Sequence, residues 1–225
     1  MALNKEELFL HLEKYKDPER AIQMKAYMRN QFEFLGIQAG KRKELTKPFL
    51  DYCKKEESVD WDFLSHLFNH TYREFQYIGS DYLNSMQKKL VPEDLLRIKE
   101  LALTKPWWDT IDSIDKVIGK LALNYPELND VLIEWSSEDS IWLRRIAINH
   151  QRHRKDLMDT DLLETIISNN LNVSEFFINK AIGWVLRDYS KTNPEWVSHF
   201  IETHKENMHP LSIREGSKYL NKNNS

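Results

Sequence analysis

The feature that most constrains this chain is a spacing of 34 residues that recurs through its second half. This spacing separates Trp108 from Trp142, and Trp142 from Phe176. It also separates the members of a second, independent set of positions: Pro92, Pro126, Thr160 and Pro194. Two sets of positions with one period indicate an array of repeated units, each packed mainly on its neighbours.

The pattern inside each unit predicts helices. Apolar residues recur at helical spacing, as at Ile111, Ile114 and Ile118, and no segment alternates strictly between apolar and polar residues. With only 6 Gly and 7 Pro, the composition favours long helices over strands and tight turns. The predicted helices span 4–15, 17–30, 40–53, 60–68 and 72–88, followed by the hairpins 92–104 with 107–124, 126–136 with 140–152, 160–170 with 174–190, and 194–204 with 210–220.

We therefore predict an all-α, HEAT-like helical-repeat solenoid, curved with a concave cleft, that forms one domain over residues 1–225. The period of 34 applies to residues 92–225, and the N-terminal helices within 4–55 cap the array. Tetratricopeptide repeats have the same period, but their Trp-x-x-Leu-Gly-x-x-Tyr signature is absent here.

Several classes of protein are excluded by composition. Cys53 is the only cysteine, so no disulfide framework or cysteine zinc site is expected. His66 and His70 are four residues apart but have no HExxH motif or third ligand, so we predict no metal site. The glycines form no phosphate-binding loop, which argues against a nucleotide cofactor, or any cofactor. No run of 18 apolar residues and no signal peptide is found, so we expect a monomeric cytoplasmic protein without membrane attachment.

Charge is distributed unevenly, although the net charge is only −3. Residues 125–139 contain acids and no Lys or Arg, whereas residues 140–155 contain cations and no acid. The cations of the second segment are Arg144, Arg145, Arg152, Arg154 and Lys155. Because the two helices of a repeat form opposite surfaces, the array is expected to present one basic face, although both segments could equally be ordinary solvated surfaces.

Residues that break the repeat are candidates for function. The 34-residue equivalents of Asp112 are Ile146 and Lys180, so a carboxylate and a lysine replace an apolar residue. Lys180, Trp184 and Arg187 share one face of a predicted helix, and Trp108 and Asp112 share a face of another. The alternative interpretation places Trp108 in the core and gives Asp112 a local role, as a cap or paired with Lys116 at ~0.3–0.5 kcal/mol. Trp135 and Trp142 are predicted to be core residues.

Four motifs carry a resemblance to a known family: FLGI at 34–37, KPWWDTIDSID at 105–115, IWLRRIAI at 141–148 and FFINKAIGWVLRDYSKTNP at 176–194. They resemble the AlkD-like DNA alkylation repair glycosylases, and the similarity runs from about Asp17 to Tyr219. The resemblance implies a HEAT-like fold and hydrolytic removal of N3- and N7-alkylated purines from double-stranded DNA. It implies a catalytic aspartate at Asp112, cleft tryptophans at Trp108 and Trp184, and a cleft arginine at Arg145.

The sequence thus predicts a monofunctional alkylpurine DNA glycosylase whose partner is double-stranded DNA with alkylated purines. The cations predicted to contact DNA are Arg144, Lys180, Arg187, Arg152, Lys41 and Arg42, the last two in an N-terminal recognition segment. Two alternatives remain. One is a relative that binds distorted DNA without excision, and the other is a protein-interaction scaffold, a common use of helical solenoids.

Overall fold

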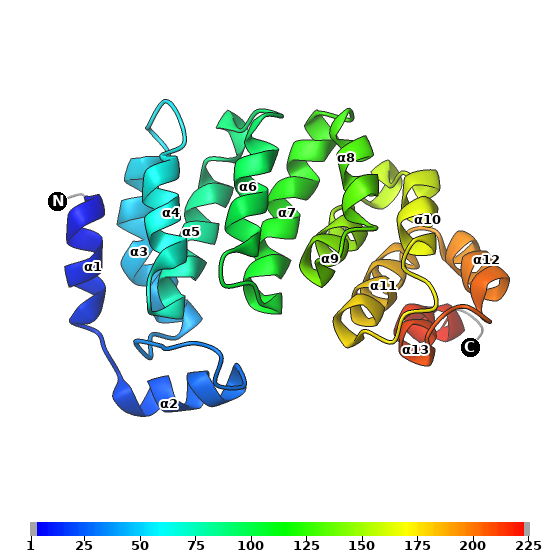
Figure 1. The fold of residues 1–225 in the computed structure, drawn as a ribbon, viewed down its shortest axis with the longest axis horizontal. Coiled ribbons are helices and arrows are strands. Elements are labelled where there is room, and N and C mark those ends of the chain that lie inside the picture. The colour runs from blue at the N-terminus through cyan, green and yellow to red at the C-terminus, as the bar shows by residue number, and fades with distance from the viewer. Residues whose placement is uncertain (1–3, 223–225) are drawn as a thin grey trace. The chain divides into compact units, whose positions relative to one another are not determined.

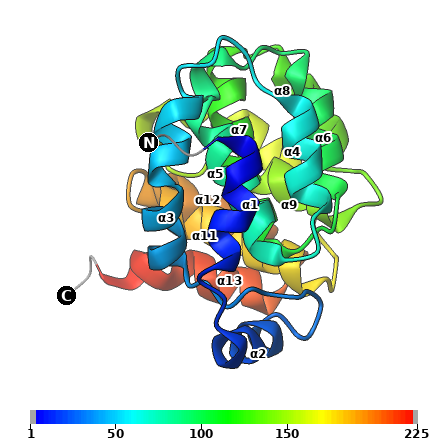
Figure 2. The ribbon, with the colours of Figure 1, turned by 90° about the vertical axis from the view of Figure 1, so that its left-hand side faces the viewer.

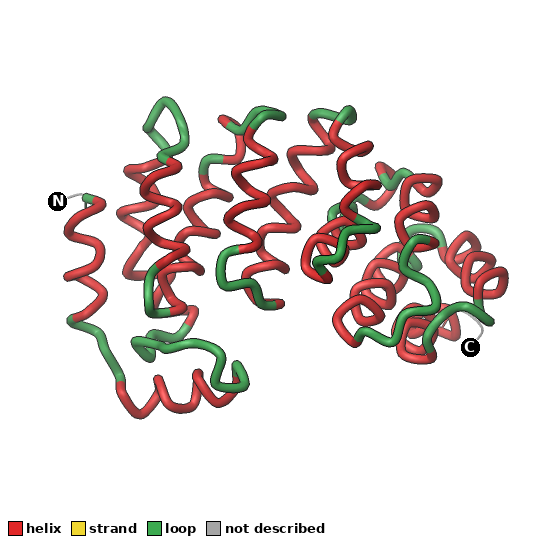
Figure 3. Tube along the Cα trace, viewed as in Figure 1, coloured by secondary structure: helices red, strands yellow, loops and turns green. Residues whose placement is uncertain are grey.

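The computed structural model describes residues 4–222 of the chain. This part of the chain is built from α-helices and short helical turns joined by loops, with no strand (Figure 3). The prediction of an all-α fold is confirmed. Within the same residues, no helix is long and apolar enough to cross a membrane.

The helices fall into two compact units, Met1–Lys105 and Pro106–Ser225 (Figure 1). The helices of unit 1 are α1 (Lys5–Glu13), α2 (Pro18–Tyr27), α3 (Ala39–Cys53), α4 (Trp61–Asn69), α5 (Arg73–Ser85), the helical turn η1 (Gln87–Lys89) and α6 (Asp94–Leu103). Those of unit 2 are α7 (Trp108–Asn124), α8 (Leu128–Trp135), α9 (Ile141–Asn149), the helical turn η2 (Lys155–Leu157), α10 (Thr160–Ser168), α11 (Phe176–Tyr189), α12 (Pro194–His204), α13 (Pro210–Gly216) and the helical turn η3 (Ser217–Lys222).

Unit 2 consists of two layers of helices. In one layer α7 packs on α9, α9 on α11 and α11 on α13, and in the other α8 packs on α10. The first layer contains the second helix of each predicted hairpin, and these helices begin at Trp108, Ile141, Phe176 and Pro210. Their near-constant spacing agrees with the repeat predicted from the sequence. This layer holds most of the predicted site residues.

Aromatic residues at or next to the starts of these helices pack on one another, and two of the three are not the residues that mark the 34-residue period. The rings of Trp107, Trp142 and Phe177 form a triad, with centroid distances of 5.6 Å, 5.4 Å and 5.0 Å. Trp108 and Phe176, the residues that fit a spacing of 34, are not in the triad. Trp142 is buried, as is Trp135, so both are core residues as predicted.

Three helices of unit 1 begin where their capping residues predict. Asn4 and Glu7 form a reciprocal capping box at α1, Asp17 caps α2 with Pro18 in the first turn, and Asp60 caps α4. Pro48 lies inside α3 without ending it. Helix α2 runs crosswise to α1 and α3 and buries none of its residues (Figures 1 and 2).

The loop that follows α2 is held by a buried carboxylate. Glu74, in the first turn of α5, is fully buried and accepts hydrogen bonds from the backbone N–H groups of Leu35, Gly36 and Ile37 at 2.9 Å, 2.9 Å and 3.0 Å. An isolated β-bridge between Glu33 and Tyr72 joins the same segments. The FLGI motif is therefore a structural element of unit 1, tied to the start of α5.

Candidate functional site

Asp112 and Arg145 form the centre of the candidate site in unit 2. Arg145 Nε donates to Asp112 Oδ1 at 2.8 Å and Nη2 donates to Oδ2 at 2.9 Å, a paired geometry that fixes both planes. Arg145 Nη1 also donates to the carbonyl oxygen of Phe177 at 2.6 Å, which ties α9 to α11. The arginine side chain is 1% exposed and the aspartate 17%, so the carboxylate is the part of the pair that solvent can reach.

Close packing of α7 on α9 brings these two side chains together. Gly119 faces the end of α9, where a Cβ on residue 119 would lie 2.0 Å from the carbonyl oxygen of His150. Only glycine permits this approach. The alternative interpretation of Asp112, a pair with Lys116 on its own helix, is wrong, because both carboxylate oxygens are bonded to Arg145 and Lys116 is exposed.

Trp184 lies at the meeting point of three cations. The Cζ atoms of Arg145 and Arg152 lie 5.1 Å and 5.2 Å from the Trp184 ring centroid, and Lys180 Nζ lies 5.9 Å from it. Such distances allow cation–π attraction. Trp184 remains partly exposed, so its ring combines an accessible apolar surface with a strongly positive border.

Lys180 and Arg187 are linked through an acid that the sequence analysis did not single out. Lys180 Nζ donates to Glu215 Oε1 and Arg187 Nη1 donates to Oε2, both at 2.8 Å. The hydrogen bond from Lys180 is the first cause that lowers the pKa of Glu215 below its ordinary value. Helix α13 comes this close because residue 183 is glycine, whose Cβ would lie 2.5 Å from that of Glu215. The cluster keeps one net positive charge.

A second acid lies one helical turn behind Asp112. Asp115 is 2% exposed, and its Oδ2 has no hydrogen-bond partner among the described residues. Burial, and then the charge of Asp112, raises the pKa of Asp115 to about 8. Asp115 is therefore mostly protonated at neutral pH. The motif WDTIDSID could have indicated that Asp115 lies near Asp112, since residues three apart share a helical face.

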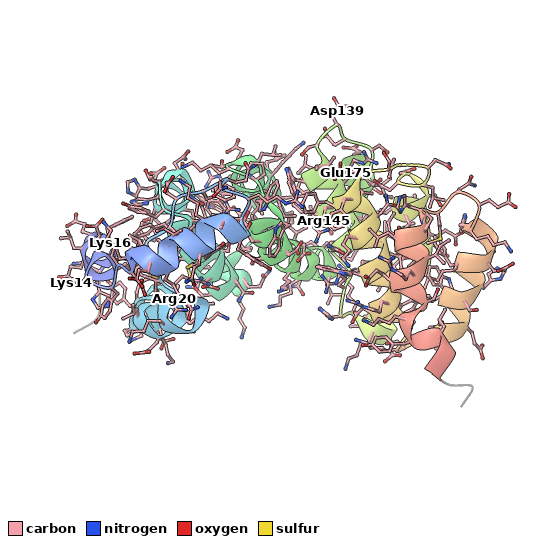
Figure 4. The ribbon with its side chains drawn as sticks, turned by 90° about the horizontal axis from the view of Figure 1, so that it is seen from below. Lys14, Lys16, Arg20, Asp139, Arg145 and Glu175 are labelled. Atoms are coloured by element: carbon pink, nitrogen blue, oxygen red, sulfur yellow. The ribbon has the colours of Figure 1, made fainter. Side chains whose placement is uncertain are left out.

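The remaining predicted residues lie in different places. Trp108 is the first residue of α7, partly buried, one turn before Asp112. Arg144 lies away from the Trp184 cluster, because its Nε donates to Asn170 at the end of α10. Figure 4 shows Arg145 among the side chains of unit 2, whereas Asp139 projects outward from the turn before α9.

The two N-terminal cations differ from each other. Lys41 is exposed on α3 and pairs with Glu44 at 2.9 Å. Arg42 is 8% exposed and its guanidinium lies 3.5 Å from Asp81 and over the ring of Tyr77. The structure therefore places Arg42 in the packing of unit 1 and not on its surface, because the helix turns this position inward. Lys41 alone of the pair presents its charge to solvent.

The fold and the site together define an all-α helical-repeat protein with a carboxylate–arginine pair beside a tryptophan bordered by cations. Residues 8–220 match the sequence profile of the DNA alkylation repair enzyme family, so this chain belongs to that family. A solved structure described as a predicted DNA alkylation repair enzyme from Enterococcus faecalis is similar over 91% of this chain and 96% of its own, with 35% identity and a TM-score of 0.85. No match was found among curated proteins.

Membership of this family confirms the resemblance noted in the sequence and supports a role in DNA alkylation repair. It indicates DNA as the partner.

Proposed function

We propose that this protein is a DNA glycosylase that excises cationic N3- and N7-alkylpurines by hydrolysing the N-glycosidic bond. The observation that carries the proposal is the solvent-reachable carboxylate of Asp112, held by Arg145 beside the partly exposed ring of Trp184. A carboxylate fixed in this way stabilises positive charge that develops nearby, and it does so without reorganisation during the reaction.

The chemistry of the substrate matches this minimal site. An N3- or N7-alkylpurine carries a positive charge, so the base leaves with the electrons of the C1′–N bond as a neutral molecule and needs no general acid. Positive charge then develops on the deoxyribose, where Asp112 stabilises it and orients the water that adds to C1′. The proton that this water releases passes to the carboxylate and from there to solvent. The indole faces of Trp108 and Trp184 favour the same charge, at roughly 0.5–2 kcal/mol each.

The surrounding cations supply contacts to the DNA backbone. Arg152, Lys180 and Arg187 lie around or beside Trp184 and would hold phosphates that set the register of the duplex. Lys41 on α3 supplies a further positive charge within unit 1. Arg145 acts differently from these, because its guanidinium is buried and committed to Asp112 and Phe177.

The test is an excision assay with duplex DNA that contains 7-methylguanine. In Asp112→Asn the negative charge is lost and the size is kept, while one of the two hydrogen bonds from Arg145 loses its acceptor. We expect release of free base to fall by about a hundredfold or more, the scale of losing one preorganised electrostatic group, with lesion-DNA binding near wild type. Circular dichroism and a melting curve check that the variant is folded, and Asp139→Asn, an exposed substitution, serves as the matched control.

Three results would contradict the proposal. Full activity of Asp112→Asn would move catalysis to another group. Excision of uracil as readily as 7-methylguanine would require a general acid for a neutral leaving base. Binding of lesion DNA without release of a base would instead support a second candidate function, the recognition of distorted DNA by its shape. The observation that favours this second function is the ion pair of Asp112 with Arg145, which neutralises the carboxylate.

A further inference from the structure

Seven polar side chains in the described part of unit 2 have a buried atom without a hydrogen-bond partner, and three of them lie on or next to the helix faces that carry Asp112 and Arg145. Asp115 Oδ2, both side-chain atoms of Asn149, and Arg152 Nε lack hydrogen bonds to the described residues. Asp115 and Asn149 are 34 residues apart and occupy equivalent positions on α7 and α9, which pack on each other. Buried polar atoms without partners cost stability, so such a cluster is a candidate for function rather than architecture.

The cluster lies directly behind the proposed site. Asp115 follows Asp112 by three residues on α7, and Asn149 follows Arg145 by four residues on α9, so each shares a helical face with a member of the central pair. Arg152 lies in the turn after α9, with its Cζ 5.2 Å from the ring of Trp184. The charged groups that act on Asp115 are Asp112 and Lys116 from its own helix, and Arg145 and Arg152 from α9 and the turn after it.

We propose that Asp115 is a positioning residue, which stays an uncharged acid so that Arg145 remains bonded to Asp112 and Arg152 remains on the face of Trp184. This inference rests on the proposed function only where it concerns base excision; the positions of Arg145 and Arg152 do not depend on that function. An ionised Asp115 would be a second carboxylate on the same face of α7, and the unpartnered Nε of Arg152 is the donor it would attract. Arg152 would then leave Trp184 and lose its phosphate contact.

The charge of Asp115 therefore determines where Arg152 lies. While Asp115 is protonated, Asp112 is the one charged carboxylate at this point of α7, and the positive border of Trp184 is complete. Once Asp115 ionises, the cluster gains a negative charge that repels phosphate. Since its pKa is raised to about 8, this change takes place just above neutral pH.

A spectroscopic experiment without DNA tests the positioning step. Trp184 fluorescence is isolated as the difference between wild type and Trp184→Phe and is followed from pH 7 to pH 9.5. We expect this signal to titrate near pH 8 as the cation leaves the ring, and to stay constant in Asp115→Asn, which cannot ionise. Asp139→Asn should titrate like wild type. An unchanged titration in Asp115→Asn, or none in wild type, would overturn the inference.

A second measurement follows undamaged-duplex affinity over the same pH range. Wild-type affinity should fall about tenfold between pH 7 and pH 9, the loss of one charge-assisted contact, whereas the affinity of Asp115→Asn should stay within about twofold. A parallel fall in both proteins would contradict the inference. Base release from 7-methylguanine DNA is measured alongside. Its absence at every pH would refute the glycosylase proposal, while the fluorescence and affinity results would still decide the role of Asp115.

Discussion

Glu74 in unit 1 and Asp115 in unit 2 are both buried carboxylates on a helix, yet their surroundings are opposite. Glu74 accepts three backbone hydrogen bonds from residues 35–37, whereas Asp115 Oδ2 accepts none from the described residues. Three N–H donors stabilise an ionised carboxylate and fix the loop that donates them. Without such donors, the charged form of Asp115 is disfavoured and the acid remains protonated.

The comparison separates two uses of a buried acid. In unit 1 the acid is part of the architecture, because removing it would release a loop that no other described side chain holds in the same way. In unit 2 the acid lowers stability and lies beside the groups proposed to act on DNA. A buried acid that is fully hydrogen bonded therefore indicates structure, and one without partners next to a cluster of charges indicates function.

The largest expected effect is the loss of stability caused by Glu74→Gln. The amide keeps one acceptor oxygen but turns an NH₂ group toward backbone N–H donors, so at least one buried donor loses its partner. We expect a loss of about 3 kcal/mol in the free energy of unfolding, measured by urea denaturation. Glu57→Gln, at an exposed glutamate in the same unit, is the control. A change of less than about 0.5 kcal/mol, typical of surface positions, would show that Glu74 is not structural.

The second prediction is that Asp115 lowers the stability of the folded protein at neutral pH. Its pKa is raised to about 8 in the folded protein from an ordinary value of 3.8, so the unfolded chain releases the proton at a lower pH than the folded chain. Stability therefore falls as pH rises from about 4 to about 8. Asp115→Asn removes this dependence, and we expect its Tm at pH 7 to exceed that of wild type by ~2–4 °C or more.

This gain should disappear below pH 4, where both states of the wild type hold the proton. Calorimetry at pH 7 and, where the protein stays folded, at pH 4 measures the difference between the two proteins. A lower Tm for Asp115→Asn at pH 7 would mean that the carboxyl group makes a stabilising bond, and the contrast with Glu74 would then fail.

The sequence predicted what depends on local periodicity. Helix existence, the repeat and the core positions of Trp135 and Trp142 follow from spacing alone, because each helix exposes the same face at each turn. Boundaries were less accurate, since α9 ends at Asn149 and not near residue 152. The aromatic triad was not predicted, because Trp107 lies outside the 34-residue spacing: it precedes α7 with an extended backbone, and its ring packs on Trp142.

Contacts between side chains of different repeats could not be predicted from the spacing of residues along the chain. The departure of Asp112 from the repeat marked it as a candidate, and the family resemblance marked Arg145, yet nothing in the spacing showed that the two bond to each other. Arg42 was expected on the surface, because a charged residue gives no sign in the sequence that a partner such as Asp81 will bury it. Glu215 was missed because its role depends on how closely α13 packs on α11, an approach that glycine at position 183 permits.

The smallest expected effect concerns Glu215, an intermediate case in which two cations from α11 satisfy a carboxylate that is not fully buried. Its pKa is lowered, first by the hydrogen bond from Lys180, so its contribution to stability is present above the ordinary value of 4.5 and is lost as pH falls through the folded pKa. Glu215→Gln should cost ~1 kcal/mol or less at pH 7, because partly exposed ion pairs contribute little.

The same substitution should strengthen DNA binding. Loss of the Glu215 charge frees Lys180 and Arg187 for phosphates, so duplex affinity should rise and the slope of log affinity against log salt should become steeper by about 0.9 for each added contact. Titrations at several salt concentrations measure this slope, with Glu127→Gln on the exposed start of α8 as the control. Weaker duplex binding by Glu215→Gln would instead mean that the acid holds the two cations in the positions that DNA requires, and Glu215 would then be a positioning residue like Asp115.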